Sequence, residues 1–205
     1  MSDNLGTLFG SEARVKIIRL FIFNADEAYD IEDISLKSKV AKSAARKEAG
    51  VLLRSGLIKK RIFYKTIEKK VRGKIQEVKK KTAGFILNTD FVHLPGLRQL
   101  LIATKSLERD NLIKRLSKAG KLTLVAVSGI FIQNPESRVD LLIVGNNMNR
   151  ATLTSSIRAL EAEIGRELAY AFFETQDYQY RLGMYDKLVR DILDYPHEVL
   201  LNKLD

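Results

Sequence analysis

The sequence predicts a mixed α+β protein with two domains. Residues 1–105 show three helical patterns followed by a long pair of strands, and residues 106–205 show apolar strands alternating with helices, as in a small α/β domain. Charge divides at nearly the same place, since residues 1–120 carry a net charge of +13 and residues 121–205 carry −3. Two domains with different partners are therefore expected, and the first of them is expected to bind a polyanion.

Bulk composition narrows the class of protein. The chain has 205 residues, of which 45% are hydrophobic and 29% are charged, and this balance is typical of folded domains. It has no cysteine, which excludes disulfides and thiolate metal sites and favours a cytoplasmic location. The N-terminus lacks the pattern of a signal peptide, and the longest apolar run, Leu122 to Ile132, is too short to span a bilayer. No membrane partner is expected.

Positive charge is concentrated in residues 37–81, here called the basic segment. It holds seventeen Lys or Arg and three acids, a net charge of +14 against +10 for the whole chain. The segment lacks the apolar helical face of Trp, Phe and Leu that an interfacial membrane anchor needs. The phosphates of a nucleic acid are thus the expected partner.

Local signals predict two helices before the basic segment. Ser11 caps the first, residues 11–23, which is apolar nearly all round and therefore buried. Asp30 caps the second, residues 30–38, and Asp33 stands at the third helical position, where it can complete a capping box.

A third helix is predicted over about residues 42–55. Ala45, Ala49 and Leu52 recur at spacings of four and three, which marks them as the inner face, and Gly56 ends the helix. The outward residues are then Lys42, Ser43, Ala44, Arg46 and Lys47, with Glu48 a further candidate for that face.

A β-ribbon is predicted to follow this helix. Residues 57–67 are rich in β-branched and aromatic side chains, Gly73 marks a turn, and residues 78–87 return. A ribbon of this length and charge is expected to lie across the phosphate backbone or to enter a minor groove, although lysines on a solvated hairpin also protect sheet edges against aggregation.

The order of buried helix, short helix, turn, basic helix and basic ribbon resembles the winged helix-turn-helix of bacterial and archaeal transcriptional regulators, over about residues 8–90. The resemblance implies that helix 42–55 enters the DNA major groove and that the ribbon, about residues 59–81, lies on the phosphate backbone. The family usually has Ser or Thr where this chain has Ala41, and the missing cap is worth roughly 1 kcal/mol unless Ser38 or Ser43 substitutes for it. The DNA-binding residues implied in this way are Lys39, Lys42, Ser43, Ala44, Arg46, Lys47, Lys59, Lys60, Arg61, Lys65, Lys69, Lys70, Arg72, Lys74, Lys79, Lys80 and Lys81.

Helical segments are predicted to join the two domains. Pro95 begins one that runs to about Ile102, and residues 107–119 form the next, ended by Gly120. We place the boundary between them, which gives a first domain of residues 1–105 and a second of residues 106–205.

The second domain is predicted to have strands at residues 121–132, 138–145 and 167–173, with a helix at residues 151–164 and two short helices near the end. Ser128-Gly129 and the run Ser137-Arg138-Val139-Asp140-Leu141 resemble the minimal nucleotidyltransferase domain over about residues 107–203. In that family a Gly-Ser loop binds triphosphate and an Asp-x-Asp pair holds Mg²⁺.

The sequence departs from this family at the positions that carry its chemistry. Arg138 replaces the first acid of the pair, the Gly-Ser order is inverted, and the third strand offers no acid at the matching place. A cation in place of a carboxylate repels Mg²⁺. We therefore expect an inactive domain without catalytic residue, metal or cofactor, in which Asp140 pairs with Arg138 or caps a turn. Its vestigial positions are Ser128, Gly129, Arg138 and Asp140.

The leading hypothesis is a DNA-binding transcriptional regulator whose second domain serves dimerisation, effector binding or docking of a protein partner. Two alternatives stay open: an active nucleotidyltransferase acting on a protein or small molecule, and an antitoxin-like interaction protein. The histidines, His93 and His197, are too far apart in sequence to indicate a site. RNA also fits the charge, although the ribbon has few aromatic side chains for a single-strand binder.

Overall fold

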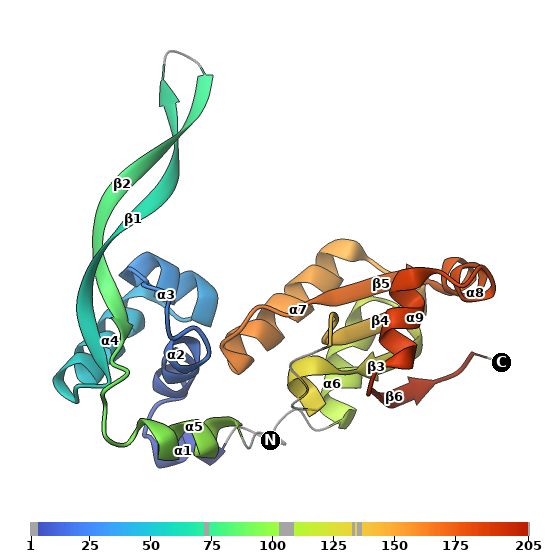
Figure 1. Ribbon diagram of the computed structural model, residues 1–205, viewed down its shortest axis with the longest axis horizontal. Helices are drawn as coiled ribbons and strands as arrows, with labels where there is room; N and C mark the ends of the chain where they lie inside the picture. Colours follow the sequence, from blue (N-terminus) through green and yellow to red (C-terminus); the bar gives the residue numbers. More distant parts are fainter. Residues whose placement is uncertain (1–3, 72–73, 103–108, 133, 135–136, 205) are drawn as a thin grey trace. The chain divides into compact units, whose positions relative to one another are not determined.

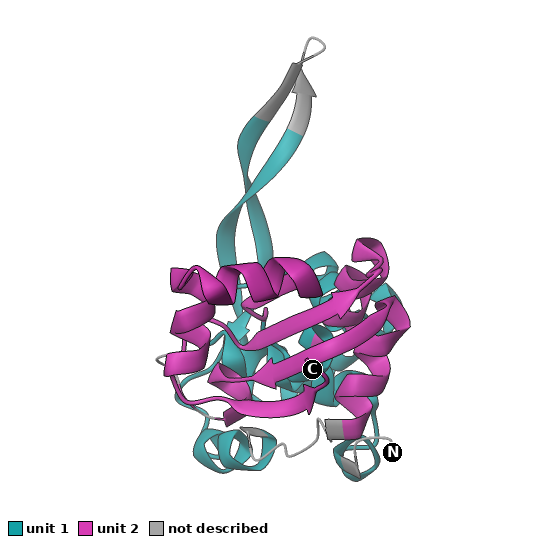
Figure 2. Cartoon of the chain, turned by 90° about the vertical axis from the view of Figure 1, so that its right-hand side faces the viewer, with its two compact units in different colours: residues 1–104, 161–166 teal, residues 105–160, 167–205 magenta. Residues whose placement is uncertain are grey.

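A computed structural model describes residues 4–71, 74–102, 109–132, 134 and 137–204. It shows a mixed α+β chain with two separate β-sheets, as the sequence predicts (Figure 1). The chain divides into two compact units, which Figure 2 shows in different colours. Unit 1 comprises residues 1–104 and 161–166, and unit 2 comprises residues 105–160 and 167–205. Within the described ranges, no helix combines the length and the apolar character that crossing a bilayer requires.

Unit 1 consists of short helices and one long ribbon. Its elements are α1 (Asn4–Leu8), α2 (Glu12–Phe23), α3 (Ile31–Ser38), α4 (Lys42–Arg54), β1 (Ile58–Val71), β2 (Lys74–Leu87) and α5 (Leu94–Ile102).

Capping interactions set the ends of these helices. Ser11 accepts the Arg14 N–H at 3.1 Å and begins α2. At α3, Asp30 accepts the Asp33 N–H while the Asp33 carboxylate accepts the Asp30 N–H, so the predicted capping box is present. Lys39 ends α3 in the left-handed region, with φ 50°, and this sharp reversal sets the short turn into α4.

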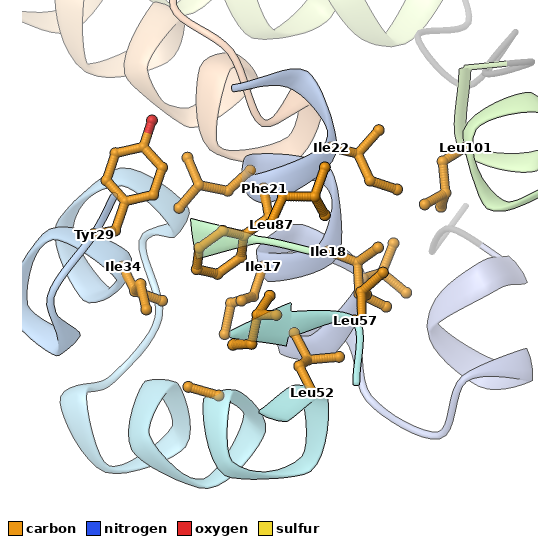
Figure 3. Packing of buried hydrophobic residues seen from close by; sticks show 14 of the residues in the cluster. Ile17, Ile18, Phe21, Ile22, Tyr29, Ile34, Leu52, Leu57, Leu87 and Leu101 are labelled. Atoms are coloured by element: carbon orange, nitrogen blue, oxygen red, sulfur yellow. The ribbon is translucent and has the colours of Figure 1, made fainter. Parts of the chain in front are cut away.

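The core of unit 1 lies between α2, α3, α4 and the base of the ribbon (Figure 3). The inner positions predicted for the third helix are buried there together with the apolar side chains of α2. Burial of such side chains supplies most of the stability of helices this short, since isolated helices of their length are marginal in water. The largest fully buried side chains of this core are Ile17, Phe21, Ile34, Ile58, Leu87 and Leu101.

The ribbon is a regular antiparallel pair. Its register runs from Ile58 opposite Leu87 to Val71 opposite Lys74. Near the base of the ribbon, Tyr29 exchanges two backbone hydrogen bonds of 2.9 Å with Phe85. These bonds form an isolated antiparallel β-bridge between Tyr29 and β2. Gly84 permits this approach, because a Cβ there would overlap the Tyr29 carbonyl oxygen.

Unit 2 is built on a four-stranded mixed sheet in the order β5-β4-β3-β6. β4 and β5 are parallel and are connected by the long helix α7, whereas β3 pairs antiparallel with both β4 and β6. The elements are α6 (Arg109–Leu116), β3 (Lys121–Val127), β4 (Leu141–Asn146), α7 (Arg150–Ile164), β5 (Tyr170–Glu174), α8 (Thr175–Gly183), α9 (Lys187–Asp194) and β6 (Glu198–Asn202), with 3-10 turns at Ser117–Ala119 and Gly129–Ile132.

Both faces of this sheet are buried. Alternate residues such as Leu124, Leu142 and Phe173 pack against Tyr178 of α8 and against α9. The intervening residues, for example Ile143, are buried on the opposite face. Continuous apolar runs therefore appear in β3 and β4, as expected for strands covered on two sides.

Unit 2 corrects one expectation about secondary structure and contains one strand that was not predicted. The strand predicted over residues 121–132 ends at Val127, because Gly129 has φ +55° and cannot continue an extended strand. Residues 198–202 form the edge strand β6, which was not predicted from the sequence.

Candidate nucleic-acid interface

Helix α4 separates an apolar face from a cationic one. Ala45 and Ala49 are fully buried, whereas Lys42, Arg46 and Lys47 are exposed on the opposite side. Ser43 is also exposed, and Ala44 is half-buried at the margin of the two faces. A helix of this diameter, with its charged side outward, can be accommodated in the major groove of duplex DNA.

The start of α4 has no side-chain cap. Ala41 occupies the N-cap position with an extended backbone and supplies no acceptor. Ser38 does not substitute for it, since its hydroxyl is buried and has no hydrogen-bond partner among the described residues. The first backbone N–H groups of α4 thus have no side-chain acceptor at the N-cap, and helix N-termini of this kind attract phosphate.

Glu48 lies on the inner face, which corrects the expectation that it could point outward. It is 5% exposed, and its carboxylate accepts a hydrogen bond from Arg14 Nε at 2.8 Å. The outward face of α4 therefore presents no acid beside Arg46 and Lys47 within the described residues.

The ribbon presents cations on both of its faces. The side chains of Lys59, Lys60, Arg61, Lys79, Lys80 and Lys81 are all exposed. Arg72 and the predicted turn at Gly73 lie outside the described residues, as do the side chains of Lys69, Lys70 and Lys74.

Lys65 differs from the other predicted phosphate contacts, because it is half-buried and paired with two acids. Its ammonium lies 2.5 Å from Asp33 Oδ1 and 3.3 Å from Asp30 Oδ2, so it ties β1 to the start of α3. Burial alone would lower the pKa of Lys65, but the two carboxylates outweigh it and the pKa is raised. Burial likewise opposes ionisation of Asp30, yet the Asp33 N–H and the Lys65 ammonium hold the pKa of Asp30 below its ordinary value. This lysine has a structural role.

In unit 2, Asp140 organises the loop that follows β3. It is buried, and its Oδ1 accepts the Ile130 N–H while its Oδ2 accepts the Ala169 N–H, both at 2.9 Å. Gly129 passes so close that a Cβ would overlap this carboxylate. Asp140 thus serves as a cap for two chain segments, which is one of the two roles expected for it.

Arg138 does not pair with Asp140. Its guanidinium donates to Asp191 Oδ2 of α9 at 2.7 Å, on the surface of unit 2. Ser128 is buried and donates its hydroxyl hydrogen to the Val139 carbonyl oxygen. All four vestigial positions lie near the ends of β3 and β4, and the side chains of Ser128, Arg138 and Asp140 are occupied in structural hydrogen bonds or ion pairs.

These residues do not fit a site for paired Mg²⁺ ions. Both oxygens of Asp140 already accept backbone N–H groups, and Arg138, two residues before it, carries a cation that is paired with Asp191. In the part of the chain that the structure describes, no three His, Asp or Glu side chains are grouped in a way that could hold a metal ion.

Two features of the interface are missed by pattern reasoning on the sequence. Ile62 and Tyr64 are exposed on the ribbon, although their β-rich surroundings are equally consistent with burial. Their spacing of two, on the same side as Lys60, is the signal that could have identified them as one surface.

Comparisons with models of protein families, with curated proteins and with solved structures found no match for this chain.

Proposed function

We propose that this chain is a transcriptional regulator that binds double-stranded DNA through unit 1 as a winged helix-turn-helix. The observation that carries the proposal is the pairing of two exposed cationic surfaces in one unit. One is the outward face of α4, with Lys42, Arg46 and Lys47, and the other is the ribbon. Figure 1 shows α3, α4 and the ribbon following one another in that unit.

Helix α4 is the proposed reading element. Arg46 and Lys47 have the side chains best suited to the acceptor pair of a guanine in the major groove, and Ser43 can bond to any base edge. Lys42 is 3.4 Å from Glu32, but this ion pair is exposed on both sides and holds the lysine only weakly. Lys39 in the preceding turn is exposed and is proposed as a backbone contact.

The ribbon is the proposed backbone contact. Its exposed cations on residues 59–61 and 79–81 can neutralise several phosphates, which gives affinity without sequence preference. The bridge between Tyr29 and Phe85 supports the winged-helix assignment, because it pairs the chain between α2 and α3 with the ribbon.

For unit 2 we propose an inactive nucleotidyltransferase-like domain that serves dimerisation, effector binding or partner docking. The use of Asp140 as a loop cap and of Arg138 in a surface ion pair supports this assignment. Incubation with labelled nucleoside triphosphates and Mg²⁺ tests it. The expected result is no transfer and no metal-dependent binding, and transfer that is lost in Asp140→Asn would overturn it.

The DNA-binding proposal is tested by fluorescence anisotropy of labelled duplexes titrated with the full chain at several salt concentrations. The expected result is a steep fall of log K with log [salt], with about 0.9 units of slope for each phosphate neutralised. Arg46→Ala with Lys47→Ala should reduce the preference for selected sequences over random duplex. Lys187→Ala, an exposed lysine of α9, is the matched control and should leave binding unchanged. Affinity that is insensitive to salt would contradict the proposal.

Competition experiments separate DNA from RNA. Unlabelled duplex DNA should displace the labelled duplex at lower concentration than duplex RNA, whose deep and narrow major groove does not admit a helix. Preferential displacement by duplex RNA or by single strands would overturn the choice of DNA.

A further inference from the structure

The end of α8 and the start of α9 carry a group of exposed apolar side chains. Tyr180, Met184 and Tyr185 are 67%, 65% and 74% exposed, and Leu182 and Leu188 are exposed as well. These five residues fall within nine consecutive positions, on two helices of unit 2 that follow one another in Figure 1. We call this group the α8–α9 patch.

Hydrogen bonds fix the shape of the patch. The Met184 N–H donates to the Tyr180 carbonyl oxygen at 3.0 Å, and the Tyr185 N–H donates to the Leu182 carbonyl oxygen at 3.3 Å. Tyr180 and Met184 are four residues apart at the end of a helix, so their side chains lie on the same side of it. Asp186 then caps α9 through its side chain. The patch is therefore preformed, and binding through it costs little conformational entropy.

Tyr185 is a costly residue at its position in the chain. Its backbone is in the left-handed region, with φ 54°, which disfavours any side chain with a Cβ and which Gly or Asn more often occupies. The fold gains little from the ring, since the ring is largely exposed and the Arg190 guanidinium lies 5.7 Å from its centroid. A large aromatic side chain that is held at a strained position and left open to solvent indicates a contact outside the unit.

The charges around the patch are balanced. Residues 177–194 carry four acids and three bases, and Arg138 adds a fourth base through its ion pair with α9. Arg181 is paired within the unit, with its Nε 3.0 Å from Asp177 Oδ1 and its Nη1 3.2 Å from Asp186 Oδ2. A polyanion or a strongly charged protein would meet no excess of opposite charge here. An apolar surface with a neutral rim matches instead a second surface of the same kind.

The area of the patch agrees with a protein contact. A large aromatic side chain buries about 150–250 Å², so the exposed fractions of Tyr180 and Tyr185 can contribute roughly 200–350 Å². With Leu182, Met184 and Leu188 added, the patch reaches the size of about 300–600 Å² at which the largest apolar patch of a chain is often functional. A standard interface takes about 800 Å² from each partner, as an apolar centre within a polar rim.

We propose that the α8–α9 patch binds the same patch on a second copy of this chain, so that unit 2 forms a twofold dimer. In such an interface one surface faces itself, which requires an apolar centre and a rim that carries both signs of charge. The tyrosines are the central anchors, since aromatic rings pair with one another in offset-stacked or edge-to-face contacts. This inference rests on the proposed function of unit 2, and it selects dimerisation from the three roles named there.

Sedimentation equilibrium of the full chain without DNA tests the proposal. The parent protein is expected to be a dimer in the micromolar range. Tyr180→Gln with Met184→Gln, combined in one chain, keeps good helix formers at the end of α8 and removes the apolar side chains. Because two central anchors are lost, the dimer dissociation constant should rise by about thirtyfold or more.

Tyr185→Asn separates a role in the interface from a role in the fold. Asparagine adopts the left-handed region more readily than tyrosine, so the melting temperature in dilute solution, where the parent is monomeric, should stay the same or rise. The same change removes the ring and should raise the dimer dissociation constant by about tenfold or more. A lower melting temperature with unaltered association would show that the tyrosine serves the fold, and the inference would fail.

Leu36→Ser is the matched control, since Leu36 is 71% exposed but lies on α3 in unit 1. This variant and Lys187→Ala, which removes an exposed lysine beside the patch, should dimerise like the parent protein. A monomeric parent chain, or patch variants that associate like the parent, would overturn the inference. Loss of the dimer in Leu36→Ser would place the interface in unit 1 and overturn it as well. Because no DNA is present, each of these results is independent of the DNA-binding proposal, which the salt titration tests separately.

Discussion

Arg14 on α2 and Glu48 on α4 form an ion pair of 2.8 Å between Nε and Oε2, with the glutamate on the buried face of α4. The same guanidinium donates from Nη1 to the Phe9 carbonyl oxygen at 2.7 Å. Arg14 thus connects the chain before α2, at Phe9, with the middle of α4, at Glu48. The pair sets the position of the helix that we propose reads DNA.

Replacement of Glu48 should destabilise unit 1. Glu48→Ala leaves a partly buried guanidinium without its carboxylate, and we expect a loss of about 2–3 kcal/mol in the free energy of unfolding. Urea denaturation followed by circular dichroism measures it. The control is Glu32→Ala, which removes the exposed pair with Lys42 and should cost less than about 1 kcal/mol. Equal losses in the two variants would contradict the structural role of Glu48.

A side-chain cap at the start of α4 should stabilise the protein. Ala41 has φ −59° and ψ 141°, an extended backbone that a serine can adopt without strain. Ala41→Ser should raise the unfolding free energy by about 1 kcal/mol, because the hydroxyl accepts an N–H that now has no side-chain acceptor. Ser11→Ala provides the opposite case, since Ser11 already caps α2, and it should lose about the same amount. A decrease in melting temperature for Ala41→Ser would refute this assignment of the N-cap.

The link between Asp30 and Lys65 should make stability depend on acid pH. The pKa of Asp30 is lowered on folding, so its contribution is fully present above the ordinary value of 3.8 and is lost as the pH falls through the lower folded value. Asp30→Asn keeps a capping side chain but removes the charge. It should cost about 1 kcal/mol at pH 7, and the difference from the parent should vanish toward pH 2. Urea titrations across this range measure the difference, and one that persists at the lowest pH would show that charge is not its origin.

Asp140 and Arg138 should differ sharply in their effect on unit 2. Asp140→Ala leaves the N–H groups of Ile130 and Ala169 without acceptors in a buried site, at a cost of about 2–4 kcal/mol. Arg138→Ala removes only a surface pair with Asp191 and should cost less than about 1 kcal/mol. Hydrogen exchange at Ile130 and Ala169 gives a local readout. If Asp140→Ala were as stable as the parent, its carboxylate would not be a loop cap.

Much of unit 1 could be predicted because its signals are local. The spacing of Ala45, Ala49 and Leu52 identifies the buried face of α4, and the pair Asp30 and Asp33 marks the start of α3 within four residues of chain. Unit 2 was less predictable. The edge strand β6 has no local signal that separates it from a short helix, and it becomes a strand by pairing with β3, more than seventy residues earlier.

The sequence by itself determined the amphipathic basic helix, the long ribbon and the excess of positive charge between residues 37 and 81. Helical and strand periodicity, capping and net charge depend on neighbouring residues and need no tertiary contact. Only the tertiary structure decided which charges are open to a partner. Glu48 meets Arg14 and Lys65 meets Asp33 across more than thirty residues of chain, whereas Arg46, Lys79 and Lys81 stay exposed. Ion pairing depends on distance in space, and the distances between these groups exist only once the helices and the ribbon have packed.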